Sequence, residues 1–165
     1  MTEDTPDAVV KQFHKIVTEY NTTHMPEAVR HDICTFEQLI TQQPDAIFGD
    51  SECCPLKHSF AEGCYVREIF IPRGMMLTGK IHRHAHPNFL MAGEVIVVTE
   101  NGGIEHLVAP KSMISPPGTK RAVVALTDVW WITVHVTEET NLHKIEEHVI
   151  APSYEAYWAF AGTKV

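Results

Sequence analysis

The sequence predicts a mainly β fold, an antiparallel double-sheet jelly-roll barrel preceded by two α-helices. Two apolar stripes at helical spacing occupy the first 50 residues, and short β-rich runs broken by Gly and Pro follow residue 55. No helix of crossover length separates these runs, which argues against a parallel sheet. The 165 residues suffice for one core and are too few for two ordinary domains. We expect a helical segment over residues 1–50 that packs on the barrel, the barrel over 55–137, and a C-terminal helix or tail over 138–165.

The two front helices are predicted from apolar residues that recur every three or four positions. The segment "TPDAVVKQFHKIVTEY" carries Val9, Phe13, Ile16, Val17 and Tyr20 at this spacing. The segment "MPEAVRHDICTFEQLITQQP", between Pro26 and Pro44, carries Val29, Ile33, Phe36, Leu39 and Ile40. Each helix is therefore amphipathic and needs a surface on which to bury its apolar stripe.

The β-rich half divides into roughly seven or eight strands at a spacing of about 8–12 residues, which is typical of a sandwich or barrel. The runs are "CYVREIFIP", "MMLTGKIHRHA", "FLMAGEVIVVTE", "IEHLVAP", "SMISPP", "RAVVAL" and "VWWITVHVT". Turns such as "NGG" and "PPG" separate them. These runs provide the strands of the predicted jelly roll.

Composition excludes several classes of protein. A net charge of −8, from 21 acidic and 13 basic residues, argues against a nucleic-acid binder, since phosphate affinity comes from clustered Lys and Arg. The apolar runs are far shorter than the roughly 20 residues that cross a bilayer, and the acidic start "MTEDTPDAVV" shows no secretory signal. We expect a cytoplasmic protein, of a bacterium or a phage-infected cell, that binds no membrane. Its four cysteines, Cys34, Cys53, Cys54 and Cys64, are then expected as free thiols.

The segment "KIHRHAHPNF" holds three of the 11 histidines within five positions. On an extended strand, residues two apart face the same side, so His82, His84 and His86 would project together. Neutral imidazole is the commonest metal ligand in proteins. The pattern therefore predicts a metal or ligand site, against the alternative of a polar row that faces solvent.

Two segments of the sequence resemble the two motifs of the cupin superfamily, the RmlC-like jelly rolls. "HRHAHPNFLMAGEV" resembles the first motif with Gly93 as its closing glycine, and "MISPPGTKRAVVAL" resembles the second through Pro116 and Gly118. The likeness covers about residues 62 to 136. The chain is also similar to small one-domain cupins of unassigned chemistry from phages and bacteria, which share segments that resemble "YVREIFIP", "LTGKIH" and "PPGTKRA". That narrower likeness names no reaction.

The departures from the cupin motifs concern the metal ligands. In one alignment His86 takes the place of the family's glutamate, His82 is the second histidine and Lys80 replaces the first. In the other, His84 and His86 form the histidine pair and Leu90 or Met91 replaces the glutamate. In the second motif, Arg121 stands for the histidine and Ala125 for the asparagine. The family's site of three histidines and one glutamate is therefore not intact.

His135, on the strand "VWWITVHVT", is the expected replacement for the missing ligand. It shares a face with Trp131 and Thr133 and would complete a three-histidine site with His82 and His86, with His84 as the uncertain member. Residues four apart on a straight strand are about 13 Å apart, so the chain must bend near Pro87 for His82 and His86 to meet. If the strand is straight, His82 with His84, or His84 with His86, is the better pair.

The predicted function is metal binding with chemistry of dioxygenase or isomerase type on a small molecule. The expected cofactor is a divalent transition metal, Fe, Zn, Ni or Mn, and the ligand-binding residues are Arg121, Lys80 and Asn88. Arg121 offers a planar fork to a carboxylate or phosphate, so the partner is expected to be a small, anionic molecule.

Two alternatives to an enzyme stay open on the sequence. The barrel could bind a small acidic ligand without catalysis, or serve as the scaffold of a phage structural or assembly protein, because jelly rolls host unrelated functions. The apolar segment "SYEAYWAF" and the amphipathic helices also predict a homo-oligomer, a dimer or larger.

Overall fold

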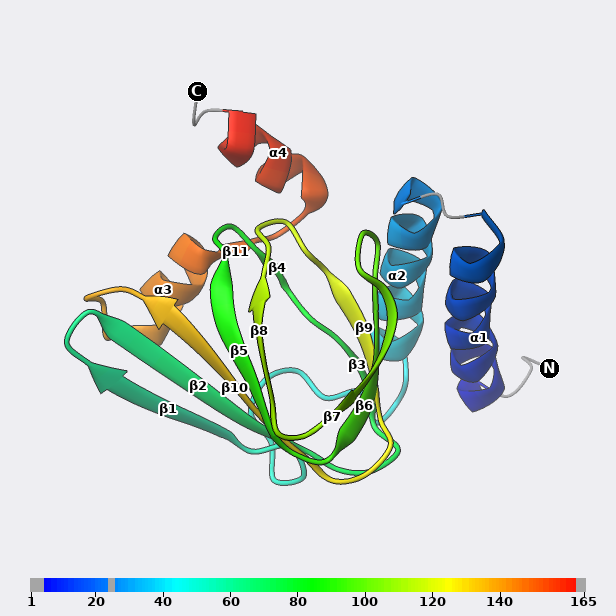
Figure 1. Cartoon of the computed structure of the whole chain (residues 1–165), viewed down its shortest axis with the longest axis horizontal. Helices are drawn as coiled ribbons and strands as arrows, with labels where there is room; N and C mark the ends of the chain where they lie inside the picture. The colour runs from blue at the N-terminus through cyan, green and yellow to red at the C-terminus, as the bar shows by residue number, and fades with distance from the viewer. Residues whose placement is uncertain (1–4, 24–25, 163–165) are drawn as a thin grey trace.

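The centre of the molecule is formed by two antiparallel sheets that face each other (Figure 1). The computed structural model describes residues 5–23 and 26–162. One sheet has the order β1-β2-β10-β5-β8 and the other has the order β3-β9-β6-β7. Every pair of neighbours in both sheets is antiparallel, so the predicted double-sheet jelly roll is confirmed.

The five-stranded sheet consists of β1 (Leu56–Ala61), β2 (Cys64–Ile71), β10 (Val129–Val136), β5 (His86–Ala92) and β8 (Lys111–Ser115). The four-stranded sheet consists of β3 (Met76–Thr78), β9 (Arg121–Ala125), β6 (Glu94–Thr99) and β7 (Gly103–Val108). Two short strands, β4 (Ile81–His82) and β11 (Ile150–Ala151), pair separately.

The described residues form eleven strands, more than the sequence predicted. The run "FLMAGEVIVVTE" is two strands, β5 and β6, because the chain turns at Gly93. The run "MMLTGKIHRHA" contributes β3 and β4. Strand β1, "LKHSFA", was not predicted, because polar residues occupy three of its central positions.

Two glycines of the predicted motifs are required by the backbone. Gly93 has φ of 88°, and a Cβ there would collide with the carbonyl oxygen of Asp128. Gly118 has φ of 77°, and its N–H donates to the carbonyl of His82 at 2.8 Å. Side-chain-bearing residues rarely adopt this left-handed conformation, so both turns depend on glycine.

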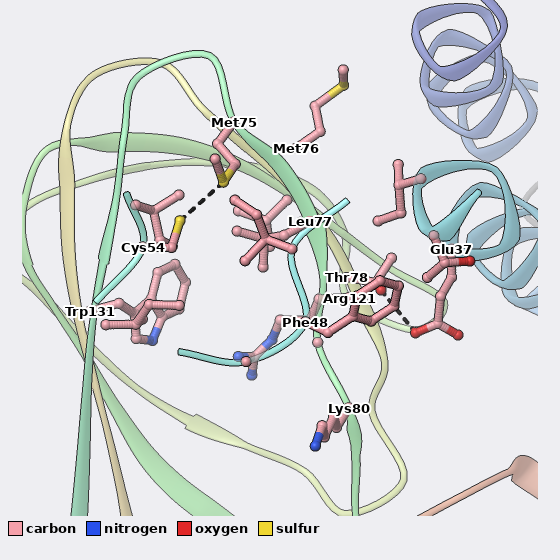
Figure 2. Close-up of a pocket in the computed structure, with 18 of the residues that line it drawn as sticks. Glu37, Phe48, Cys54, Met75, Met76, Leu77, Thr78, Lys80, Arg121 and Trp131 are labelled. Carbon is pink, nitrogen blue, oxygen red and sulfur yellow. Dashed lines mark hydrogen bonds between the residues drawn. The ribbon is translucent and has the colours of Figure 1, made fainter. Parts of the chain in front are cut away.

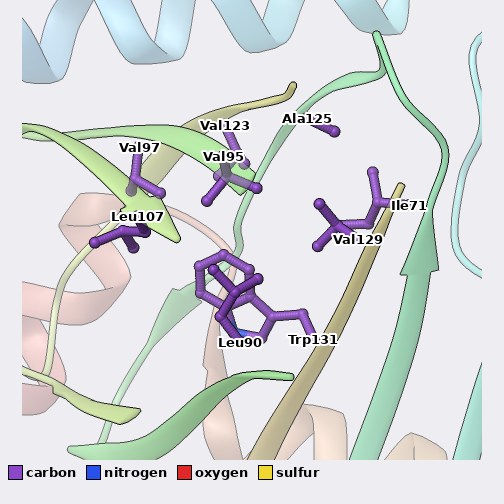
Figure 3. Packing of buried hydrophobic residues seen from close by; sticks show 9 residues of the cluster. All are labelled: Ile71, Leu90, Val95, Val97, Leu107, Val123, Ala125, Val129 and Trp131. Carbon is purple, nitrogen blue, oxygen red and sulfur yellow. The ribbon is translucent and has the colours of Figure 1, made fainter. Parts of the chain in front are cut away.

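The interior between the sheets is apolar at one end. Alternate residues of facing strands point inwards and form one cluster, shown in Figure 3. Its members are Ile71, Leu90, Val95, Val97, Leu107, Val123, Ala125, Val129 and Trp131. At the other end the inward positions of the same strands carry histidine and arginine, which places a polar site inside the barrel.

The N-terminal helices, α1 (Thr5–Thr23) and α2 (Pro26–Thr41), lie against the four-stranded sheet (Figure 1). The predicted stripe of α2 supplies Val29, Ile33 and Phe36, which are fully buried with Val98 of β6 and Ala122 of β9. The side chain of Tyr20, predicted on the α1 stripe, lies outside the described residues. The helices therefore close the outer face of the four-stranded sheet.

The C-terminal segment contains α3 (Leu142–Val149), β11 and α4 (Tyr154–Gly162). Asn141 caps α3, because its side chain accepts a hydrogen bond from the N–H of Lys144 at 3.2 Å. Strand β11 then pairs with β4, so that Ile150 lies opposite His82. This pairing fixes the strand that carries His82.

Two further sequence predictions concern the whole chain. The four cysteines are free thiols, as predicted. No helix within residues 5–23 and 26–162 is long and apolar enough to cross a membrane.

Candidate metal centre and ligand cavity

Three of the four histidines proposed as ligands come together inside the barrel. His82 ends β4, His86 begins β5 and His135 lies near the end of β10. One nitrogen from each ring lies within 4.8 Å of the others, and the ring centroids are 4.0 Å (His82 to His86), 4.9 Å (His86 to His135) and 5.0 Å (His82 to His135) apart. Such spacing suits three nitrogens that converge on one ion.

A bend brings His82 and His86 together, although it lies earlier than predicted. Strand β4 ends at His82, and the N–H of Arg83 donates to the carbonyl of Val149 at 2.8 Å. The chain turns over residues 83–85, and His86 then pairs with Ser115 of β8. Pro87 was predicted at the bend but lies within β5, since proline is tolerated in a strand where its missing N–H is not required.

The same bend separates His84 from the other histidines. Its ring lies 5.3 Å from that of His148 in α3 and makes an edge contact with Phe160 of α4 at 5.4 Å. The expectation that His82, His84 and His86 all project to one side is therefore wrong, because it assumed a straight strand. His84 supports the C-terminal helices instead.

The three clustered imidazoles are neutral at physiological pH. Burial, together with the neighbouring His86 and His135, lowers the pKa of His82 to about 2. Burial also lowers the pKa of His86 and of His135 to about 4 each. Because a metal binds the lone pair of a neutral imidazole, this protonation state fits a metal centre.

The hydrogen bonds of the cluster leave ring nitrogens free for an ion. His86 uses Nδ1 to contact the backbone carbonyl of His84 at 3.2 Å, so Nδ1 carries the proton and Nε2 keeps its lone pair. The Nδ1 atom of His82 is buried and has no hydrogen-bond partner. Buried polar atoms are almost always paired. The residues present therefore fit a bound divalent cation.

Asn88 holds the polar end of the barrel together. It is fully buried, and its Oδ1 accepts from Arg121 at 3.3 Å and from the indole of Trp131 at 3.2 Å. Its Nδ2 donates to the carbonyl of His86 at 3.1 Å and to Ser115 at 2.6 Å. Asn88 was predicted as a turn residue and ligand contact. It lies within β5, and its amide is already fully engaged with the protein.

Arg121 and Lys80 line a cavity of about 1030 Å³ that reaches His82 and His86 (Figure 2). The predicted inward direction of Arg121 is thus observed, and burial lowers its pKa to about 10. Lys80 is half exposed and forms an ion pair with Glu146 of α3. It therefore lies at the rim of the cavity.

Arg67 was not singled out from the sequence. It lies on β2 opposite Thr133, lines the same cavity, and has its pKa lowered by burial. A signal was present in "YVREIFI": the inward positions Tyr65, Ile69 and Ile71 are apolar or aromatic, and a charge interrupts them. A charged residue on the buried face of a strand is a candidate for function.

Part of the cavity wall is apolar, with Ile69, Met75, Leu77, Val123 and Trp131 among its lining residues, whereas Glu37, Asp45 and Glu146 add acidic groups elsewhere on the wall. Figure 2 shows Met75, Leu77 and Trp131 at one end and Lys80 at the other. A second cavity of about 250 Å³ is lined by His84, His135 and His148. The histidine cluster thus contacts both cavities, the larger through His82 and His86 and the smaller through His135.

Two facing antiparallel sheets and two motif glycines at tight turns define a jelly-roll fold of the cupin type, with a histidine cluster inside the barrel. The fold is thus the one that the motif resemblance predicted. The chain is similar to the structure of ectoine synthase from P. lautus, with 14% identity over 71% of this chain and 86% of that chain, and a TM-score of 0.50.

Two further solved structures are similar. An RmlC-like cupin from Shewanella frigidimarina is 20% identical over 59% of this chain and 95% of that chain, with a TM-score of 0.46. KdgF from Halomonas sp. is 18% identical over 54% of this chain and 84% of that chain, also with a TM-score of 0.46. No family model and no curated protein matches the sequence.

Proposed function

We propose that the chain binds one divalent transition metal, Fe, Zn, Ni or Mn, through His82, His86 and His135 and acts on a small molecule in the adjoining cavity. The observation that carries this proposal is the convergence of three neutral imidazoles within 4.8 Å beside a cavity of about 1030 Å³. Three protein ligands leave coordination positions open for water or substrate, as catalytic metals require.

The proposed reaction is of dioxygenase or isomerase type. A bound metal would supply a Lewis acid that orients a substrate and polarises its oxygens. The chain supplies the surroundings: Asn88 fixes Arg121 and Trp131, and the half-buried apolar wall of the cavity limits access of water. Within residues 5–23 and 26–162, no carboxylate joins the three histidines, so the site differs from the cupin pattern of three histidines and one glutamate.

Metal content of single variants tests the proposal. The protein should be purified without nickel-affinity chromatography, loaded with Zn²⁺, desalted and analysed by mass spectrometry of the metal. We expect one equivalent in the wild-type protein and in His84→Ala, and strong loss in His82→Ala, His86→Ala and His135→Ala. Exposed His106→Ala is the matched control. Full zinc occupancy in all three cluster variants would refute the proposed metal site.

A non-catalytic module that binds a small acidic ligand is the second candidate. It is favoured by the arginines in the cavity, which can bind an anion without a metal. Under this alternative, ligand affinity is the same before and after the metal is removed with a chelator. The third reading, a phage structural or assembly protein, stays a prediction that no feature of the structure favours.

We also propose that copies of the chain associate. The outer face of the five-stranded sheet presents large apolar side chains to solvent, Met91, Ile114, Trp130 and Val136, with exposed fractions of 53%, 66%, 40% and 86%. Exposed apolar patches often mark interaction sites. Light scattering at micromolar concentration should give at least the mass of a dimer, and a monomer alone would contradict this proposal.

A further inference from the structure

Two arginines from opposite sheets face the cavity beside the histidine cluster. Arg67 lies on β2 of the five-stranded sheet, and Arg121 lies on β9 of the four-stranded sheet. We infer that they form a clamp for the carboxylate of a small organic acid whose apolar body packs against the apolar part of the cavity wall. The inference rests on the proposed function and names the class of substrate or ligand.

Neither arginine has an acidic partner in the described part of the chain. Of the acidic residues, only Glu105 acts on Arg121 through its charge, and the one group that favours the charged form of Arg67 is the phenol of Tyr65. Arg121 contacts Asn88 and lies over the ring of Trp131 at 5.9 Å, and both of these groups are neutral. Burying an unpaired charge is unfavourable, so two such groups at one cavity indicate a missing anion.

The histidine cluster strengthens this need for an anion. Both arginines line the same cavity as His82 and His86, so their positive charges lie beside the histidine cluster. A divalent cation at the cluster would add further positive charge. An anion between the arginines would offset this repulsion, so the metal and the anion should bind cooperatively.

The residues next to the two arginines indicate the chemistry of the rest of the ligand. On β2 the next inward residue is Ile69, and on β9 it is Val123. Both line the cavity, as do Met75 and Leu77. The cavity wall next to each arginine on its own strand is therefore apolar, which fits a molecule whose charged group is attached to an apolar body.

A carboxylate matches this arrangement better than a phosphate. Its two oxygens accept paired hydrogen bonds from a planar guanidinium. A phosphate has a further charged oxygen that needs its own partner, and the side chains next to the two arginines on their strands, Ile69 and Val123, offer none. We therefore assign the clamp to a carboxylate and keep the phosphate as an outcome of the test.

The test uses the full chain, loaded with Zn²⁺ or freed of metal with a chelator, and isothermal titration with named probes. The probes are acetate, butyrate, benzoate and 3-phenylpropionate, each with its primary amide, and phenyl phosphate. We expect a carboxylate with an apolar body to bind with Kd below about 10 mM and at least about tenfold more tightly than its amide. Acetate, which lacks the apolar body, should bind more weakly than 3-phenylpropionate.

Variants locate the binding to the clamp. Arg67→Met and Arg121→Met should each weaken carboxylate binding by about 10- to 100-fold, because each removes charge-assisted hydrogen bonds. Arg73→Met is the matched control, since Arg73 is exposed at the rim of the same cavity. Arginine variants should keep their zinc, whereas histidine variants lose it. If the wild-type protein binds no zinc, the proposed function is wrong. The clamp is then tested by the same titrations on the metal-free protein.

Four outcomes would overturn the clamp itself. The first is equal affinity for a carboxylate and its amide in wild-type protein, a comparison that does not depend on any variant being folded. The second is an effect of Arg73→Met as large as that of Arg67→Met. The third is binding of phenyl phosphate in preference to every carboxylate, and the fourth is no binding of any probe.

Discussion

Replacement of Asn88 by alanine should destabilise the protein strongly, because one buried amide makes four hydrogen bonds. The substitution leaves the indole N–H of Trp131 and a guanidinium N–H of Arg121 without an acceptor, and the hydroxyl of Ser115 and the carbonyl of His86 without a donor. Each buried group left unpaired costs about 1 kcal/mol. Arg121 faces the cavity and can regain a partner from water, so we expect a loss of about 3 kcal/mol.

Urea denaturation followed by tryptophan fluorescence measures this loss as a shift in the transition midpoint. Asn88→Asp should lose about half as much, because it keeps the acceptor for Arg121 and Trp131 and removes only the two donors. Asn101→Ala, at an exposed turn, is the control and should change stability by less than about 0.5 kcal/mol. A shift below about 1 kcal/mol for Asn88→Ala would refute the assignment of Asn88 as the residue that organises the site.

Three further outcomes are expected. In chelator-treated protein the free energy of unfolding should fall as the pH drops from 6.5 to 4, by about 1.4 kcal/mol per pH unit for each of His86 and His135. The reason is that these two histidines bind protons in the unfolded chain and stay neutral in the folded site. Equal urea midpoints at pH 7 and 5 would contradict this. Gly93→Ala should lower the melting temperature more than Gly49→Ala, since a Cβ at Gly93 meets backbone and one at Gly49 meets nothing within 4 Å; equal shifts would oppose the account of that turn. His84→Ala should keep its zinc but make α4 more sensitive to protease, because His84 contacts Phe160. Unchanged cleavage together with loss of zinc would instead indicate that His84 is a metal ligand.

The fold could be predicted because its patterns are local. Helical spacing in residues 5–41 and alternation in the later runs depend only on which face each residue occupies. The inward direction of His135 and Arg121 followed from the same alternation and from the motif resemblance. Strand β1 was missed because it lies beside β2 at the edge of the sheet and has no apolar alternation.

The details of the site depend on contacts distant in sequence. The bend over residues 83–85 is set by the backbone hydrogen bond from Arg83 to Val149 and by the pairing of β4 with β11. The sequence near His82 contains no pattern that predicts either contact. The same contacts turn His84 toward α3. Arg67 was overlooked because a single arginine in a strand usually faces solvent, and its inward register is fixed by the pairing with Thr133.

The most direct test of the metal centre is X-ray absorption spectroscopy of the zinc-loaded protein at the zinc edge. It reports the elements bound to the ion and their distances. We predict three imidazole nitrogens at about 2.0–2.1 Å, with the remaining positions filled by oxygen. A first shell that contains sulfur at about 2.3 Å, or that lacks imidazole scattering, would contradict a site formed by His82, His86 and His135.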